Sequence, residues 1–415
     1  MLNKLLIFNT YFFTHSYSHE CFSEKKEKKI MNERVALLIN MPAPYRLPFF
    51  RDLSRYCDLL VIFDDYLEPN REWIISEREL GFQYTFAKGF RLPYQRKRYD
   101  ISADDKRYLQ IRYDILPTLY TFKPHVVVSA EMGLRTLQAA GYSKVTSTPL
   151  IIWWEGTRHT EGWVGKGKSF IRESLVKGSQ RFWSNGREST ALLLDYGALP
   201  GTIDDGITGV DTKFFALKTK SLLSQRVQMR SELELEGVVF LFIGQFTKRK
   251  GLLNYLKALE ILYSKSLRGW SAVFVGNGPL ETILRNWQLE HPDIPMLISS
   301  FVQPHELPRF YASADVFVLP TLDDNWSLVT LEAAVAGLPQ LFSVYNGCTS
   351  ELLCDERMGR AIDPLKTEEF ASALKNYVDE PPPRLPDGLI WRFVDYYHPE
   401  QLAARAWESI RKAVE

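Results

Sequence analysis

The chain of 415 residues is long enough for two or three domains of about 150 residues each, and 45% of its residues are hydrophobic, enough for packed cores. Its 51 basic residues balance 50 acidic ones, so net charge gives no argument for a nucleic-acid partner. No apolar run approaches the roughly 20 residues that span a bilayer. The four cysteines lack metal-ligand spacing, which favours reduced thiols in a cytoplasmic protein.

Residues 1–30 do not follow the pattern of a targeting signal. Their apolar stretch is interrupted by Asn9, Thr10 and Tyr11, and lysines follow it where a signal peptide has them in front. Met31 stands immediately before the first clear strand, so a start of translation at Met31 is an alternative to a translated extension. Residues 1–30 therefore carry no fold prediction.

From Arg34 onward, apolar strands alternate with helical patterns. Strands are predicted at 35–39, 59–63, 126–129, 150–154 and 181–184, and helices at 47–56, 103–122, 133–141 and 188–196. Strands separated by helices are typical of a parallel, doubly wound sheet. We therefore expect residues 31–210 to form an α/β domain.

Polar side chains follow several of these strands, at the edge where open α/β sheets bind their ligands. Arg46 ends the loop after the first strand, which is either a proline-stiffened turn or a contact for an anion or acceptor. Glu131 follows the strand 126–129, and Glu155 and Arg158 follow the strand 150–154. These four residues are candidates for the acceptor side of a cleft.

The segment 86–99 interleaves basic and aromatic residues, and Lys166 and Lys168 extend its charge. A solvated face is one interpretation, and contact with anionic lipid headgroups or a lipid-linked acceptor is another. Such a patch is also typical of nucleic-acid binding through Arg96, Lys97 and Arg98, but the balanced net charge argues against that partner.

A second series of strands and helices begins at Val238. The strand 238–243 is followed by the loop 244–251, Gly-Gln-Phe-Thr-Lys-Arg-Lys-Gly, which leads into a helix over 252–263. Cations together with the free amides of a helix start can hold a diphosphate, although a solvated basic turn is the alternative. The next strand, 272–275, ends in a turn with two glycines, which we interpret mainly as a tight reversal of the chain.

The segment 315–351 carries the strongest functional signal. A buried strand over 316–319 leads into a loop with Asp323 and Asp324, and Ser327 is placed to cap a helix through Ala336. A further strand follows at 340–344, so the predicted βαβ unit presents acids at the carboxyl end of a strand. Glu332 lies eight residues after Asp324, inside the helix.

This segment, D-N-W-S-L-V-T-L-E, closely resembles the E-x7-E segment of retaining glycosyltransferases of the GT-B fold, glycosyltransferase family 4. The loop 244–251 resembles the family's donor-phosphate segment, the turn 276–280 its G-x-G-P-L turn, 299–302 its base-packing segment and 347–351 its G-G-x-x-E segment. The chain departs from the family at Asp324 in place of glutamate, at Gln245 in place of arginine and at Cys348 in place of glycine. A glycine-rich loop is also missing at 40–46.

The resemblance implies a GT-B fold with two Rossmann-like doubly wound domains that face a cleft. Residues 31–210 would be the acceptor-side domain, 211–395 the nucleotide-sugar-binding domain and 396–415 a helix that crosses back to the first domain. It implies catalytic roles for Asp324, Glu332, Lys250 and His159, although His159 as a solvated loop histidine is the alternative. The implied donor-binding residues are Gly244, Gln245, Arg249, Lys250, Gly276, Gly278, Phe301, Val302, Asp324, Asn325, Trp326, Ser327, Leu328 and Glu332.

By the same resemblance, the chain would move a sugar, with retention, from a nucleotide-diphosphate sugar to a hydroxyl of a glycan or lipid-linked saccharide in cell-surface polysaccharide or glycoconjugate synthesis. It would work in the cytoplasm or on the inner face of the cytoplasmic membrane, with no metal and no cofactor beyond the donor. A non-catalytic nucleotide-sugar-binding subunit and a sugar-nucleotide epimerase are the alternatives. A phosphorylase is disfavoured because no pyridoxal-binding lysine segment is present.

Overall fold

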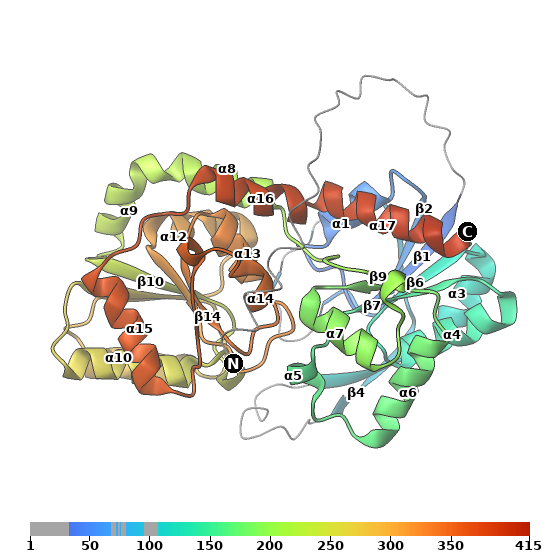
Figure 1. The fold of residues 1–415 in the computed structure, drawn as a ribbon, viewed down its shortest axis with the longest axis horizontal. Coiled ribbons are helices and arrows are strands. Elements are labelled where there is room, and N and C mark those ends of the chain that lie inside the picture. The colour runs from blue at the N-terminus through green and yellow to red at the C-terminus, as the bar shows by residue number, and fades with distance from the viewer. Residues whose placement is uncertain (1–32, 68–71, 74, 76–79, 95–106) are drawn as a thin grey trace. The chain divides into compact units, whose positions relative to one another are not determined.

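The computed structural model describes residues 33–67, 72–73, 75, 80–94 and 107–415 (Figure 1). Within these residues, the strands form one seven-stranded sheet, one six-stranded sheet and one two-stranded hairpin. Every strand pair in the two larger sheets is parallel. The predicted class, two doubly wound parallel sheets with flanking helices, is confirmed.

The first sheet has the order β3-β2-β1-β6-β7-β8-β9, so the order reverses between β1 and β6. Its strands are β1 (Arg34–Ile39), β2 (Asp58–Phe63), β3 (Gln83–Phe86), β6 (Val126–Ala130), β7 (Leu150–Trp154), β8 (Arg181–Ser184) and β9 (Ile203–Asp204). The inner strands β1, β6 and β7 are apolar and almost wholly buried because helices cover both faces of the sheet, whereas the edge strands β3 and β9 are only partly buried.

Alternate residues of β1 point to opposite faces of this sheet and join two separate cores. Val35 and Leu37 pack with α1 (Leu47–Leu53) and α17 (Pro399–Val414). Ala36 and Leu38 pack in the core formed with the other helices of this part. Those helices are α3 (Ile115–Phe122), α4 (Leu134–Thr146), α6 (Lys166–Lys177) and α7 (Arg187–Asp195), with the short α5 (Arg158–Glu161) before α6.

The second sheet has the order β12-β11-β10-β13-β14-β15, with its reversal between β10 and β13. Its strands are β10 (Val238–Ile243), β11 (Trp270–Val275), β12 (Met296–Ser299), β13 (Val316–Leu319), β14 (Gln340–Ser343) and β15 (Gly359–Ile362). Its helices are α8 (Thr212–Leu222), α9 (Arg226–Glu232), α10 (Leu252–Ser264), α11 (Glu281–Glu290), α12 (Pro308–Ser313), α13 (Leu328–Val335), α14 (Thr349–Leu352), α15 (Thr367–Asp379) and α16 (Asp387–Tyr397). Ligands of open α/β sheets bind at such reversals, at the carboxyl ends of the strands.

One predicted helix is wrong over most of its first half. Residues 107–112 form the strand β5 (Arg107–Arg112), which pairs antiparallel with β4 (Gly89–Tyr94), and the helix begins only at Ile115. Gly89 permits this pairing, because a Cβ atom there would lie 2.0 Å from the carbonyl oxygen of Ile111. Residues 103–106 and the predicted basic residues Arg96, Lys97 and Arg98 lie outside the described residues, as do residues 1–30.

The last helix, α17, packs on the first sheet although it follows the second one in the chain. It contacts α1 and strands β6 to β9. Leu402, Ala406 and Ile410 recur every four residues, so they lie on one face of the helix and are buried in the core beside β1. The indole N–H of Trp183 in β8 donates a 2.9 Å hydrogen bond to Ser409 Oγ.

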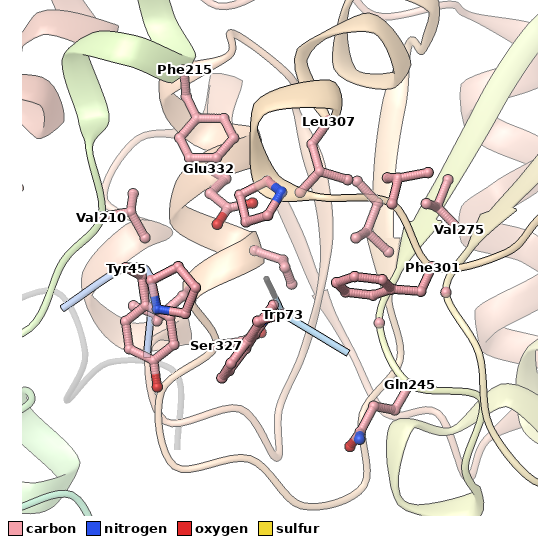
Figure 2. A pocket seen from close by; sticks show the side chains of 18 of the residues that line it. Tyr45, Trp73, Val210, Phe215, Gln245, Val275, Phe301, Leu307, Ser327 and Glu332 are labelled. Carbon is pink, nitrogen blue, oxygen red and sulfur yellow. The ribbon is translucent and has the colours of Figure 1, made fainter. Parts of the chain in front are cut away.

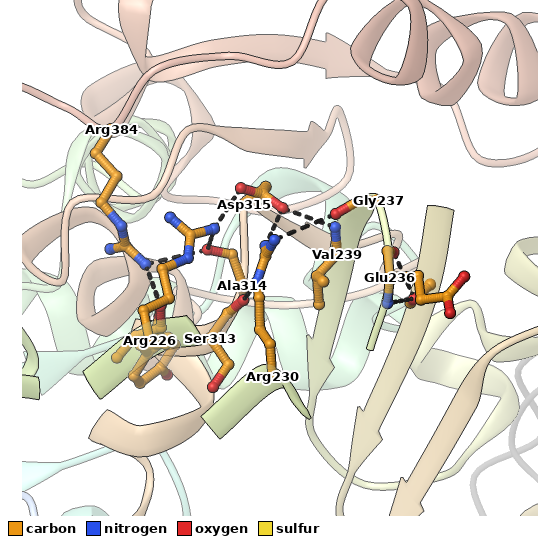
Figure 3. Close-up of polar contacts among 12 residues, drawn as sticks. Arg226, Arg230, Glu236, Gly237, Val239, Ser313, Ala314, Asp315 and Arg384 are labelled. Atoms are coloured by element: carbon orange, nitrogen blue, oxygen red, sulfur yellow. Dashed lines mark hydrogen bonds and ion pairs between the residues drawn. The ribbon is translucent and has the colours of Figure 1, made fainter. Parts of the chain in front are cut away.

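A cluster of charges joins the helix α9 and the segment before α16 to the second sheet (Figure 3). Asp315, just before β13, accepts hydrogen bonds from Arg226 and Arg230 of α9 and a 2.8 Å bond from the backbone N–H of Val239 in β10. Arg384 donates to three backbone carbonyls at the end of α12, at 2.6 to 3.0 Å. Burial and the nearby Arg226 lower the pKa of Arg384 to about 10, so it stays charged at neutral pH. This cluster lies at the amino ends of the strands and serves the fold.

Candidate functional site

A cavity of about 550 Å³ lies at the carboxyl ends of the second sheet's strands, where the strand order reverses. Loops that follow β10, β11, β12 and β13 line it together with the loop after β1 of the first sheet. Figure 2 shows Glu332, Phe215, Leu307, Phe301 and Trp73 around the same hollow. The predicted donor-binding residues that line it are Gly244, Gln245, Arg249, Lys250, Gly276, Phe301, Val302, Asp324, Asn325, Trp326, Ser327, Leu328 and Glu332.

Two glycines let the loops after β10 and β11 touch each other beside the cavity. Gly276 has a φ of +147°, and a Cβ atom on it would lie 2.0 Å from the carbonyl oxygen of Gly244. Gly278, with a φ of +150°, lies against the backbone of Phe246 in the same way and does not line the cavity. This geometry gives both glycines the structural role that the sequence predicted.

The basic loop after β10 is interlocked with the acidic loop after β13. Lys250 Nζ forms an ion pair with Asp324 Oδ2, and Arg249 Nη1 donates a 2.9 Å hydrogen bond to the carbonyl of Asp323. In return, the backbone N–H of Leu322 donates to the carbonyl of Arg249 at 2.8 Å. Side chains of Lys250 and Asp324 are 12% and 13% exposed, so the pair lies in the wall of the cavity with limited access to water.

The loop after β14 fixes the position of Asp324. Residues Asp324 and Asn346 form a parallel bridge, and the backbone N–H of Gly347 donates to the carbonyl of Asp324 at 3.1 Å. A Cβ atom on Gly347 would lie 1.9 Å from the carbonyl oxygen of Asn325, so the loops approach as closely as glycine allows. Cys348, which replaces the second glycine of the family pattern, has a φ of −86° that any residue can adopt.

Glu332 is the buried acid of the site. It lies on α13, is 7% exposed, and accepts a 2.8 Å hydrogen bond from the Tyr311 hydroxyl. Burial raises the pKa of Glu332 to about 7, although the hydrogen bond from Tyr311 acts in the opposite direction. Glu332 therefore changes its charge near neutral pH.

The start of α13 also faces the cavity. Ser327, Leu328 and Val329 line it, which brings the positive end of the helix dipole to the site. Ser327 occupies the predicted N-cap position, but its side chain makes no capping hydrogen bond. Its backbone N–H instead donates to Asn346 Oδ1 at 3.3 Å.

The first sheet contributes fewer of the predicted residues to this cavity. Glu155 lines it and forms an ion pair with Arg46, which lines a small adjoining hollow. Arg158 pairs on the surface with Asp195, at 2.5 and 2.7 Å. Glu131 follows β6 with a φ of +66°, and its carboxylate lies 3.7 Å from Arg135. Neither Arg158 nor Glu131 is among the described lining residues.

His159 contacts the acidic loop from outside the cavity. Its ring stacks on Tyr345 with centroids 4.9 Å apart, and its Nε2 lies 2.8 Å from the carbonyl oxygen of Leu322. It is also absent from the described lining residues. In this structure His159 therefore supports the loop that carries Asp324.

Glu72 and Trp73 are among the lining residues that were not predicted. They belong to the connection between β2 and β3, and Asn277 Nδ2 donates a 2.6 Å hydrogen bond to Glu72 Oε1. No motif marks them, and the contact joins residues 205 positions apart. The only available signal was their place after the carboxyl end of a strand.

The described part of the chain offers no group of three or more His, Cys, Asp or Glu residues that could hold a metal ion. Likewise, none of its helices combines the length and apolar character needed to cross a bilayer. Independence from metals stays a prediction. The thiols of Cys57, Cys348 and Cys354 are free, and Cys21 lies outside the described residues.

Comparison with known proteins relates the chain to a family of glycosyltransferases. Residues 225–386, which contain the loop 244–251, Asp324 and Glu332, match the family described as glycosyl transferases group 1. Over this part, the chain is similar to the group 1 glycosyltransferases. The sulfoquinovosyl transferase SQD2 of Arabidopsis thaliana is 24% identical to it over 367 residues, which are 84% of this chain and 67% of SQD2. The predicted enzyme class, a transferase of glycosyl groups, is thereby confirmed.

Solved structures show that this glycosyltransferase has the GT-B fold. Sucrose-phosphate synthase from Thermosynechococcus elongatus matches with a TM-score of 0.69 at 14% identity, over 92% of this chain and 98% of the synthase. The Anabaena protein HepE in complex with UDP matches with a TM-score of 0.63 at 11% identity, over 92% of this chain and 97% of HepE. At these identities the likeness concerns the fold.

Proposed function

We propose that this glycosyltransferase transfers a sugar from a nucleoside-diphosphate sugar to a hydroxyl of a glycan or lipid-linked saccharide, with retention of anomeric configuration. The observation that carries the proposal is the ion pair of Lys250 and Asp324 beside the buried Glu332, at one cavity where the strand order reverses. A cation and two acids at this place suit a ligand that has both a diphosphate and sugar hydroxyls.

In this proposal Lys250, Arg249 and the start of α13 hold the diphosphate. Two cations and a helix N-terminus are the physical means for that task, and they also stabilise the diphosphate as it leaves. Lys250 is already in the cavity wall, so the incoming phosphate would compete with Asp324 for its ammonium group. Gln245 lines the same region and offers an uncharged amide where the family pattern has arginine.

Glu332 would receive the ribose hydroxyls and Asp324 the donor sugar. Carboxylate oxygens make strong hydrogen bonds to hydroxyl donors. Asp324 has a shorter side chain than the glutamate of the family pattern, and its loop is fixed by Asn346 and Gly347. The backbone therefore fixes the position of its carboxylate. Because a short, fixed carboxylate reaches only certain hydroxyls, Asp324 would favour one particular donor sugar.

The chemistry would need no protein nucleophile. The departing diphosphate can accept the proton of the acceptor hydroxyl on the face that it leaves, while the protein supplies orientation and charge stabilisation. We propose no metal and no cofactor beyond the donor. Residues 31–210 would bind the acceptor, 211–395 the donor, and 396–415 would join the two by packing on the first sheet.

The acceptor would belong to cell-surface polysaccharide or glycoconjugate synthesis, which places the enzyme in the cytoplasm with peripheral contact to an anionic membrane. Support comes from α6, where Phe170 is 70% and Ile171 42% exposed beside Lys166 and Lys168. Exposed aromatic and basic side chains on one helix suit an anionic interface. Co-sedimentation with phosphatidylglycerol vesicles, compared with phosphatidylcholine vesicles, tests the contact, and Lys166→Glu with Lys168→Glu should abolish it.

The test of the donor site is ligand-observed NMR with UDP-, GDP- and dTDP-sugars against the wild type, Lys250→Ala and Glu332→Ala. We expect one donor class to bind the wild type and to be lost in both variants. UDP-sugars come first because HepE binds UDP in the same fold. A folded wild type that binds none of these donors would contradict the proposal.

Product analysis separates the alternatives. Release of the nucleoside diphosphate together with an axial or equatorial linkage that matches the donor anomer supports retaining transfer. A new sugar nucleotide identifies an epimerase. Donor binding without any turnover, for every acceptor supplied, identifies a non-catalytic subunit.

A further inference from the structure

We propose that the acceptor binds as an uncharged sugar ring that stacks on Trp73 and hydrogen-bonds to Glu72 and Glu155, and that phosphorylated sugars are poor acceptors. This inference rests on the proposed function and adds to it the chemical class of the acceptor. It concerns residues from the loops of the first sheet, which line the same cavity as Lys250 and Glu332.

Trp73 and Tyr45 form an aromatic pair in the wall of the cavity. Their ring centroids lie 5.9 Å apart with an interplanar angle of 81°, so the edge of one ring packs on the face of the other. In the view of Figure 2, Trp73 is drawn between Tyr45 and Phe301, and all three side chains line the cavity. A flat apolar surface beside hydrogen-bonding groups suits a pyranose ring, which has an apolar C–H face and a rim of hydroxyls.

Glu72 holds this aromatic surface over the donor loops. Asn277 Nδ2 donates to Glu72 Oε1 at 2.6 Å, and Gln303 Nε2 donates to the backbone carbonyl of Glu72 at 3.2 Å. Both partners lie in loops at the carboxyl ends of β11 and β12. Trp73 is therefore positioned next to the place where the donor sugar would meet the acceptor.

The charge on this side of the cavity is negative. Among the described residues that line it from the first sheet, Glu72 and Glu155 are charged, and none is a lysine or arginine. The guanidinium of Arg46 pairs with Glu155 and stacks against Trp153, with its carbon 5.1 Å from the ring centre. Carboxylates accept hydrogen bonds from hydroxyls but repel a phosphate.

The donor diphosphate has its own cations on the second sheet, in Arg249 and Lys250. The cavity thus has its lining cations beside the loop after β10, where they suit a diphosphate, whereas its charged lining residues from the first sheet's part are acids beside aromatic rings, which suit a neutral polyol. This division of charge predicts discrimination against anionic acceptors.

The experiment measures binding and transfer separately, in the full-length chain. Saturation-transfer NMR with methyl glucoside, methyl galactoside and methyl mannoside, and with the corresponding hexose 6-phosphates, needs no donor and therefore tests the inference even if no donor is found. We expect at least one methyl hexoside to bind the wild type and the hexose phosphates to bind about tenfold more weakly or not at all.

Trp73→Ala should lower acceptor binding and kcat/KM for sugar acceptors by about tenfold or more, while the donor Kd stays within about twofold. Trp73→Phe keeps an aromatic face and should recover most of the loss. Trp163→Ala is the matched control, because Trp163 is 60% exposed and is not among the described lining residues. Glu155→Gln removes one carboxylate and releases Arg46, so binding of the hexose phosphates should rise.

Three results would overturn the inference. Loss of donor binding in Trp73→Ala would assign Trp73 to the donor. Preference of the wild type for hexose phosphates would contradict the charge argument, and unchanged acceptor binding in Trp73→Ala would remove the stacking surface. If the wild type binds methyl hexosides but none of the donors, the proposed function fails while the sugar subsite stands.

Discussion

The Tyr311 hydroxyl donates a 2.8 Å hydrogen bond to the carboxylate of Glu332, and both side chains are buried where the second sheet reverses its strand order. Burial raises the pKa of Glu332 to about 7, and this bond limits the rise because it stabilises the charged form. The acid proposed to hold the donor ribose is therefore set near the midpoint of its titration at neutral pH.

Donor affinity should depend on pH through Glu332. If its carboxylate accepts the ribose hydroxyls, binding of a nucleotide sugar should tighten as the pH rises through about 7 and should change by up to about tenfold per pH unit below that value. Tyr311→Phe removes the bond that favours the carboxylate, so the midpoint should move to higher pH. Calorimetric Kd values between pH 5.5 and 9 measure this. A pH-independent Kd in the wild type would assign the ribose to another group.

The same acid should make the fold less stable at high pH. Its pKa is raised from 4.5 in the unfolded chain to about 7 in the fold, so the native state binds more protons and stability falls as the pH rises between these values. Above pH 7 the cost reaches roughly 3 kcal/mol. Glu332→Gln should therefore unfold at higher urea concentration than the wild type at pH 8 and at similar concentration at pH 5. Equal midpoints at both values would show that Glu332 is not desolvated in solution.

Lys250 should be essential for donor binding because it contacts the diphosphate directly, and a positive charge elsewhere on the surface should not replace it. Lys250→Ala removes the cation beside the diphosphate and leaves Asp324, 13% exposed, without this ion-pair partner. We expect donor affinity to fall by about a hundredfold, which corresponds to about 3 kcal/mol. Lys257→Ala is the control, because Lys257 is an exposed lysine on the helix that follows the same loop. A loss of similar size in both variants would indicate long-range attraction and not a contact.

The sequence was sufficient to predict the second sheet and the residues that line the cavity from that sheet, because both depend on residues that lie close together in the sequence. Apolar runs such as 316–319 predict buried strands, and Asp324 and Glu332 belong to one loop-and-helix unit. The strand β5 was predicted as part of a helix, because a short amphipathic segment fits both the helical and the strand periodicity. Only its pairing with β4 determines that it forms a strand.

The first-sheet side of the site depends on contacts that no local pattern encodes. Glu72 reaches Asn277 across 205 residues, and Glu155 takes Arg46 as its partner, which removes Arg46 from the larger cavity. His159 was predicted from the resemblance as a catalytic residue, and that role stays a prediction; its ring stacks on Tyr345 and it is not among the described lining residues. Tertiary packing determines which way a side chain points after the end of a strand, and the hydrophobic periodicity of the sequence carries no information about that packing.

Substitutions at Gly347 and Cys348 should show which of these two neighbouring positions the acidic loop needs. We expect the loop to require glycine at 347 for its close backbone approach and to tolerate other residues at 348. In Gly347→Ala the new Cβ atom would lie 1.9 Å from the carbonyl oxygen of Asn325, so the loop with Asp324 must move. Donor binding should then be lost, while the two sheets, whose cores lie elsewhere, should keep their circular dichroism spectrum.

Cys348→Ala is the matched control for that change. Cys348 has a φ of −86°, so alanine fits its backbone, and the loss of one buried sulfur should cost about 1 to 2 kcal/mol of stability. Donor affinity should stay within about threefold of the wild type, because Asp324 keeps its bridge to Asn346. If instead Gly347→Ala binds the donor normally, the close approach of the two loops does not position Asp324, and another contact, such as the ion pair with Lys250, must do so.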